Sequence, residues 1–225
     1  YLFKIKKNTS FHKSIVFGKD SIRNVNAFDF EYSFNRLKDP KLASPGAWVL
    51  NNVENFKASN DSVFSIKLKS PFAAFLGILS MKYCSVVPKE AVDYYKSKFG
   101  KNPIGTGPFK FKKWEENIKL VLRKNNLYFE KDSKGIRLPY LEAISITFLP
   151  DKKSEFMEFA QNKIDFINSI DSSFKDQLLN VNGDLKEEYL KSINLLTGPY
   201  LNNEYIGFFL GKKESILQSK KIERQ

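Results

Sequence analysis

The stretch Gly105–Trp114, GTGPFKFKKW, decides how this chain is organised. Its first four residues predict a tight turn, because glycine reaches backbone angles that other residues resist and proline fixes the chain that follows. We therefore expect Gly105 or Gly107 to have a positive φ. Aromatic residues then alternate with lysines, with one slip before Trp114, as in a strand that has one apolar face. Residues 118–123, IKLVLR, predict the second strand of a hairpin.

The segments after this hairpin predict a strand, a helix and a second strand. Residues 144–149 are apolar enough to form a central strand, and residues 154–162 have the pattern of a helix. Ile164–Ile167 is a short apolar run that would then lie parallel to the strand at 144–149, because a unit of this length normally crosses over right-handed. Further short strands are expected at 193–196 and 205–210.

An amphipathic helix is predicted over residues 26–37. Asn26 is a good N-cap because its side chain can accept a hydrogen bond from the first free backbone N–H groups. Phe30, Phe34 and Leu37 share one face at helical spacing. Asp29 stands in the first turn, where a negative charge supports the start of a helix. Packing against a core accounts for all these residues without any ligand.

Composition indicates a globular protein and excludes several classes of site. Hydrophobic residues make up 42% of the 225 residues and aromatic residues 15%, which argues against disorder. No apolar run approaches the roughly 20 residues that cross a bilayer. Cys84 is the single cysteine and His12 the single histidine, so disulfides and His-pair or cysteine-rich zinc sites are excluded. We interpret Cys84 as a buried, inert thiol and His12 as structural or solvated.

The net charge of +12 raises the question of nucleic acid binding. However, the lysines are spread along the chain among acidic residues, and no arginine cluster is present, so we expect no nucleic acid partner. Phosphate-binding loops, dinucleotide fingerprints and nucleophile elbows are also absent from the sequence. With one histidine and one cysteine a nucleophilic triad is hard to build. We therefore expect no enzyme activity and no cofactor.

The order of segments around the turn resembles a known family. The sequence PFAAFL at 71–76 and a VPKEAV segment at 87–92 precede the GTGPF turn. An NNLYF segment at 125–129, LPYL at 138–141 and the strand, helix and Ile-Asp segment already described follow it. This succession resembles the bacterial extracellular solute-binding proteins of family 5, which serve peptide and nickel ABC importers. The helix at 26–37 is similar as well, except that Asn26 stands where the family has threonine.

The resemblance implies an α/β fold of mixed α+β type. We expect an incomplete lobe like that of type II periplasmic binding proteins, with mixed sheets and flanking helices. Residues 1–108 would form the smaller inserted α/β subdomain of the first lobe. Residues 109–225 would form part of the main α/β lobe, truncated at its C-terminal end. Because the chain opens on a strand without a signal peptide, it reads as a piece of a longer protein.

The resemblance also implies a function. The chain would be part of a solute-binding component of an ABC transporter, taking a peptide or related small solute to the membrane permease by closure of two lobes. Its location would be periplasmic or at the cell surface, and any membrane association would come through a lipid anchor outside this chain. Two alternatives stay open, namely the ligand-sensing domain of a transcription regulator and a basic interaction module without a transported ligand.

Four residues are candidate ligand contacts. Tyr205 and Asn203 lie where the family has a strand that faces the ligand cleft, and an aromatic ring with a hydroxyl group can both cover a ligand and hydrogen-bond to it. Gly46 and Trp48 lie where peptide-binding relatives place an aromatic residue at the cleft. Burial in the core explains Tyr205 and Trp48 equally well. No metal site is expected.

Overall fold

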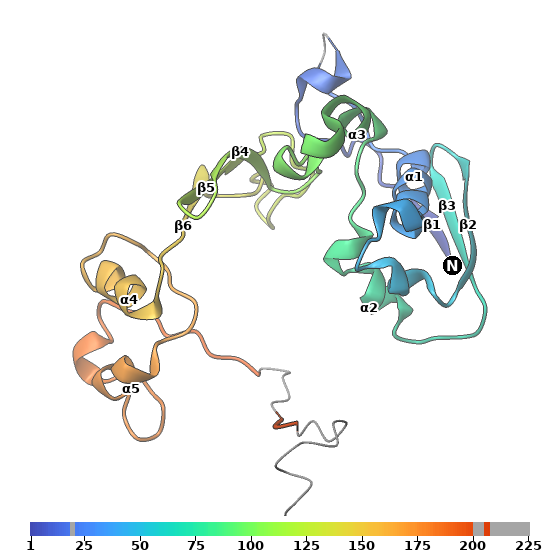
Figure 1. Ribbon diagram of the computed structural model, residues 1–225. Helices are drawn as coiled ribbons and strands as arrows, with labels where there is room; N and C mark the ends of the chain where they lie inside the picture. The colour runs from blue at the N-terminus through green and yellow to red at the C-terminus, as the bar shows by residue number, and fades with distance from the viewer. Residues whose placement is uncertain (19–20, 200–204, 208–225) are drawn as a thin grey trace, which may run out of the picture. The chain divides into compact units, whose positions relative to one another are not determined.

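The computed structural model describes residues 1–18, 21–199 and 205–207. The chain divides into two compact units, Tyr1–Asp151 and Lys152–Gln225, and Figure 1 labels their elements. The strands are β1 (Leu2–Lys4), β2 (Val53–Asn60), β3 (Val63–Leu68), β4 (Phe109–Glu115), β5 (Lys119–Lys124) and β6 (Ala143–Thr147). The α-helices are α1 (Ala27–Lys38), α2 (Phe75–Leu79), α3 (Lys89–Tyr95), α4 (Lys152–Ala160) and α5 (Ser172–Leu178). Helix α3 continues as a 3-10 helix, Lys96–Lys101.

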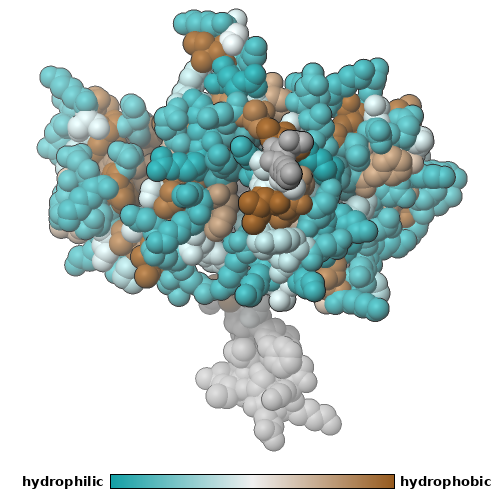
Figure 2. Space-filling view, turned by 90° about the horizontal axis from the view of Figure 1, so that it is seen from above, coloured by the Kyte–Doolittle hydropathy of each residue, from teal (hydrophilic) through white to brown (hydrophobic). Residues whose placement is uncertain are grey.

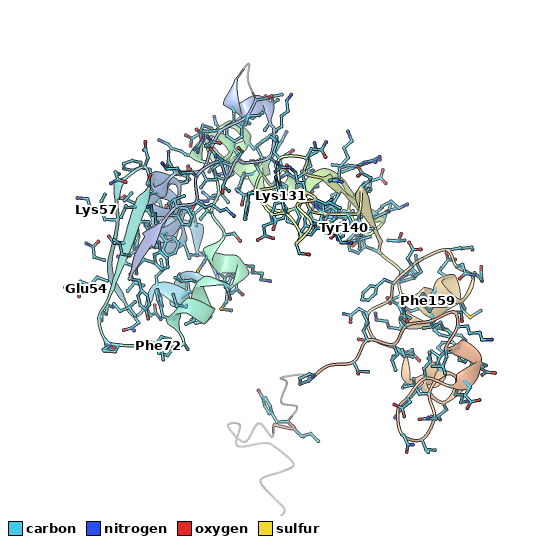
Figure 3. The ribbon with its side chains drawn as sticks, turned by 180° about the vertical axis from the view of Figure 1, so that it is seen from behind. Glu54, Lys57, Phe72, Lys131, Tyr140 and Phe159 are labelled. Atoms are coloured by element: carbon cyan, nitrogen blue, oxygen red, sulfur yellow. The ribbon has the colours of Figure 1, made fainter. Side chains whose placement is uncertain are left out.

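The first sheet has the strand order β1-β3-β2, and both pairings are antiparallel. A turn at Asp61 and Ser62 joins β2 to β3. Helix α1 lies against the sheet (Figure 1), and the backbone N–H of Ala58 donates to Glu31 Oε2 of the helix at 2.7 Å. The side chains of Glu54 and Lys57, on the outer side of β2, point away from the helix (Figure 3). The sheet therefore has one covered face and one face in solvent.

Helix α1 begins as the sequence predicts. Asn26 Oδ1 accepts from the backbone N–H groups of Phe28 and Asp29, and Asp29 Oδ2 accepts from the Asn26 N–H at 2.9 Å. This reciprocal arrangement is a capping box. Asp29 thus supports the start of the helix through a hydrogen bond as well as through its charge.

Phenylalanine side chains form the core between α1 and the first sheet. The ring of Phe34 meets those of Phe56 and Phe64 edge to face, with centroids 5.5 and 5.4 Å apart. Phe64 is 1% exposed and Phe34 is 3% exposed. A smaller second core holds Phe11, Ala91 and Ile104. The apolar face predicted for residues 26–37 is therefore a packing face.

The second sheet has the order β4-β5-β6 and is antiparallel throughout. A register shift between Phe111 and Lys113 lets Trp114 share the apolar face, which confirms the slip in the alternation. Strand β6 pairs with β5 on one side only, so the expectation that residues 144–149 form a central strand is wrong among the described residues. No residue within these three strands is fully buried, which explains why β6 does not behave as a core strand.

The second unit contains α4 and α5, which meet through stacked rings of Phe156 and Phe174 with centroids 4.2 Å apart. The parallel strand predicted at Ile164–Ile167 is wrong, because these residues form no strand. The chain leaves α4 through Asn162 at a φ of 57°, and no described segment of the second unit pairs with residues 164–167. Residues 193–196 likewise form no strand, since a short apolar run does not by itself define its structure. The strand predicted at 205–210 is absent from 205–207, and its other residues lie outside the described part.

Surface composition agrees with the even spread of charge in the sequence. Figure 2 shows one face of the molecule, on which hydrophobic groups lie in separate areas between hydrophilic ones. Among the described residues, none of the helices combines the length and hydropathy that crossing a membrane requires.

Candidate functional site

The first unit contains a cavity of about 670 Å³ between β1, α1 and the turn at Gly105–Gly107. Its wall is mostly apolar. The apolar lining residues are Phe3, Ile5, Val25, Phe30, Phe34, Phe64, Ile66, Leu79, Val86 and Phe129, together with the thiol of Cys84. Cavities of roughly 300–1,000 Å³ with such walls are typical of small-molecule sites. The turn that organises the sequence therefore borders a cavity of this kind.

The charged residues in the cavity wall are both cationic. Lys4 and Lys6 line it, and no aspartate or glutamate does. Lys6 Nζ lies 4.5 Å from the centroid of the Phe129 ring, a favourable cation–π distance. Neither lysine has an ion-pair partner among the described residues. The cavity thus combines apolar walls with uncompensated positive charge.

His12 holds the turn in place. Its backbone N–H donates to the Gly105 carbonyl at 2.8 Å, and its ring nitrogens lie 3.4 Å from the Gly105 N–H and 3.0 Å from the Gly107 carbonyl. Because Nδ1 must accept and Nε2 must donate, these contacts require the neutral imidazole with its proton on Nε2. Burial lowers the pKa of His12 and the charge of Lys110 lowers it further, against the Gly107 carbonyl, which raises it.

Asn125 forms a second hydrogen bond to the same carbonyl. Its Nδ2 donates to Gly107 O at 2.9 Å, and its Oδ1 accepts from the Leu127 N–H at 3.0 Å. Asn125 is 3% exposed. These bonds hold the turn without any left-handed glycine, because neither Gly105 nor Gly107 is among the residues with positive φ. The expectation of a positive φ in this turn is therefore wrong.

A charged cluster ties the start of α1 to α3. The Arg23 guanidinium donates to both oxygens of Asp29, at 2.5 and 3.0 Å, and to Glu90 Oε2 at 3.0 Å. Its carbon also lies 5.0 Å from the centroid of the Phe11 ring. Because Asp29 is 5% exposed, its ionised carboxylate needs the Arg23 guanidinium as a partner to offset the loss of solvation. Through the contact of Arg23 with the Phe11 ring, the cluster also reaches the residue next to His12.

Two of the four candidate contacts from the sequence, Gly46 and Trp48, lie in the first unit and do not line this cavity. A Cβ added at Gly46 would stand 2.4 Å from Cγ of Tyr83, so the glycine lets the ring pack closely. Trp48 is 47% exposed and Tyr205 is 89% exposed. Asn203 lies outside the described residues. Tyr205 belongs to the second unit, and the contact of all four residues with a ligand stays a prediction.

Sequence reasoning missed the residues that hold the turn. The Phe11-His12 pair was one signal for His12, and the Asn125-Asn126 pair was one for Asn125, yet neither spacing shows that two distant segments meet at Gly107. Among the described residues, no cluster of three histidine, cysteine, aspartate or glutamate side chains could hold a metal ion.

The folded elements and their order are those found in part of the periplasmic binding proteins. The chain is similar to periplasmic binding proteins of known structure, among them the DppA protein of Helicobacter pylori in complex with the peptide STSA. That likeness has a TM-score of 0.67 at 25% identity and covers 79% of this chain and 36% of DppA. NikZ of Campylobacter jejuni in complex with Ni(L-His) gives a TM-score of 0.64 at 25% identity, covering 79% of this chain and 33% of NikZ.

Residues 1–222 match the profile described as "Bacterial extracellular solute-binding proteins, family 5 Middle". The chain belongs to this family. It is 28% identical over 200 residues to the periplasmic oligopeptide-binding protein OppA of Salmonella typhimurium, covering 80% of this chain and 34% of OppA. It is 26% identical over 232 residues to the oligopeptide-binding protein AppA of Bacillus subtilis, covering 100% of this chain and 38% of AppA. The chain thus spans just over a third of the length of these relatives.

Proposed function

We propose that this chain is part of a solute-binding component of an ABC importer that binds a peptide or a related small solute. The match of residues 1–222 to family 5 carries this proposal. It is supported by relatives named for binding oligopeptides, dipeptides and glutathione. These names describe binding, not catalysis, which favours a transport role over an enzyme.

The proposed mechanism is capture between two lobes followed by delivery to a permease. The first unit supports this role because its helix-covered sheet and its hydrogen-bonded turn at Gly105–Gly107 border a cavity. The extracytoplasmic location and the permease partner follow from the family and form part of the proposal. The domain division at residue 108 also stays part of it.

Calorimetry of the full-length protein with a mixed peptide library tests this function. Wild type should release heat with at least one peptide pool, and Tyr205→Ala should weaken the binding if this ring covers the ligand. Trp48→Ala provides the parallel test in the first unit. A full-length protein that binds no peptide or related small solute contradicts the proposed function. If a variant binds the peptide with unchanged affinity, the substituted residue is not a ligand contact, and the proposed function still stands.

A further inference from the structure

We propose that the cavity bordered by the Gly105–Gly107 turn binds an apolar group that carries a carboxylate. The C-terminal apolar residue of a peptide and a short fatty acid share this chemistry. The inference goes beyond the proposed function, because every residue of the site lies in the first unit. It requires neither a second lobe nor a permease.

Buried apolar side chains in the cavity wall favour an apolar group on the ligand. Phe34, Phe64 and Ile66 line it and are at most 3% exposed, so they belong to the packed core and cannot move aside cheaply. Phe3, Phe30 and Phe129 add further aromatic surface to the wall. Such a surface is poorly matched to water and favours an aliphatic or aromatic group.

The charged part is specified by the lysines at the wall. Lys6 is held beside the cavity by its contact with the Phe129 ring, and Phe129 itself lines the cavity. Because no acidic side chain lines the cavity, a ligand anion would meet no repulsion from a carboxylate in the wall. An ammonium group at this place would instead meet two uncompensated positive charges. The site therefore selects anions by attraction and rejects cations by repulsion.

The remaining polar side chains of the wall are hydroxyl groups that can donate. Ser85 and Thr106 line the cavity, and Thr9 Oγ1 is buried without a hydrogen-bond partner among the described residues. In contrast, the Gly107 carbonyl already accepts from both His12 and Asn125. The wall thus offers hydroxyl donors while this carbonyl acceptor is already used. Carboxylate oxygens, which only accept, fit this set of groups.

Cys84 provides a reporter for occupancy of the cavity. It lines the cavity and is the single cysteine of the chain, so a thiol reagent reads this position alone. Burial raises the pKa of the Cys84 thiol, which lowers the fraction of reactive thiolate and slows the labelling reaction. A ligand seated in the cavity should shield the thiol and slow the reaction further.

The experiment measures the rate of Cys84 labelling in the 225-residue chain at rising concentrations of four probes. N-acetylglycyl-L-phenylalanine and octanoate carry the carboxylate on a peptide and on an acyl chain. Their amides, N-acetylglycyl-L-phenylalaninamide and octanamide, are the neutral matches. We expect saturable slowing by at least one acid and a weaker effect of its amide by about tenfold in concentration, as expected for loss of one charge-assisted contact.

Variants of the lysines sharpen the result. Lys6→Gln should weaken protection by the acids about tenfold and leave the amides unchanged, whereas Lys6→Arg should retain the preference for acids. Lys57→Gln is the matched control, because Lys57 is exposed on β2 and does not line the cavity. Far-UV circular dichroism confirms that each variant is folded.

The probes separate the two sources of the carboxylate. Protection by the peptide acid alone assigns the site to a peptide terminus, and protection by octanoate alone assigns it to a fatty acid. Equal protection by acids and amides, or no protection by either acid, overturns the proposal. Peptide binding by the full-length protein with an unprotected Cys84 would overturn the cavity site while leaving the proposed function intact.

Discussion

The two sheets of the first unit have the same size and pairing but different surroundings. Each has three antiparallel strands, yet β3 of the first sheet contains the buried Phe64 and Ile66 while the second sheet has no fully buried strand residue. The difference is helix α1, which covers the first sheet and contributes Phe34 to its core. Pairing alone therefore does not make a core, since strand hydrogen bonds contribute little until a face is buried.

The largest expected effect comes from removing the same side chain in each sheet. Phe64→Ala should destabilise the chain by about 3–5 kcal/mol, because it opens a cavity in packed core. Phe111→Ala, in the half-buried β4, should cost only about 1–2 kcal/mol. Urea unfolding followed by circular dichroism measures both. Equal shifts of the two midpoints would contradict the contrast between the sheets.

The second largest loss of stability should follow from breaking the ion pair between Arg23 and Asp29 at the start of α1. Asp29→Ala removes a capping-box partner and leaves the Arg23 charge half buried, so we expect a loss of about 2–4 kcal/mol. The exposed pair of Glu54 and Lys67, 2.8 Å apart on the solvent face of the first sheet, is the matched control. Glu54→Ala should cost less than about 1 kcal/mol. A cost for Asp29→Ala as small as this control would remove the bracing role of the cluster.

Alanine substitutions at Gly46 and Gly107 compare a glycine that allows close packing with a glycine in a turn. Gly46→Ala places its Cβ against the Tyr83 ring and should cost about 1–3 kcal/mol through overpacking. Gly107→Ala meets no atom within 4 Å and needs no left-handed backbone, so its effect should stay within about 0.5 kcal/mol. Thermal unfolding measures both variants. A larger loss at Gly107 than at Gly46 would show that the turn, not the Tyr83 contact, depends on glycine.

We expect His12 to make a smaller contribution to the free energy of unfolding, and this contribution depends on pH. Because its folded pKa lies below the ordinary value of 6.5, the unfolded chain binds the proton more readily. The contribution of neutral His12 is therefore complete above pH 6.5 and is lost as pH falls through the window below it, by at most about 1.4 kcal/mol per pH unit. Unfolding of wild type and His12→Gln between pH 5.5 and 7.5 measures the slope. An equal slope in both proteins would show that His12 does not contribute to it.

Local signals predicted one part of the fold well. The Asn26 cap, the helix face of α1, the hairpin at β4 and β5 and the slip before Trp114 all depend on residues close in sequence. The family resemblance also holds, because it uses the order of many segments. In contrast, the conformation of the turn depends on His12 and Asn125, which reach Gly107 from distant segments. The cavity could not be predicted for the same reason.

The most direct test of the account compares peptide affinity of the full-length protein with that of this 225-residue chain. Calorimetry with the best peptide from the library should show binding by the full-length protein and binding at least about 100-fold weaker by this chain, because the proposed capture uses contacts from two lobes and this chain spans just over a third of its relatives' length. Equal affinity of the two proteins would contradict capture between two lobes. Absence of peptide or other solute binding by the full-length protein would contradict the solute-binding function itself.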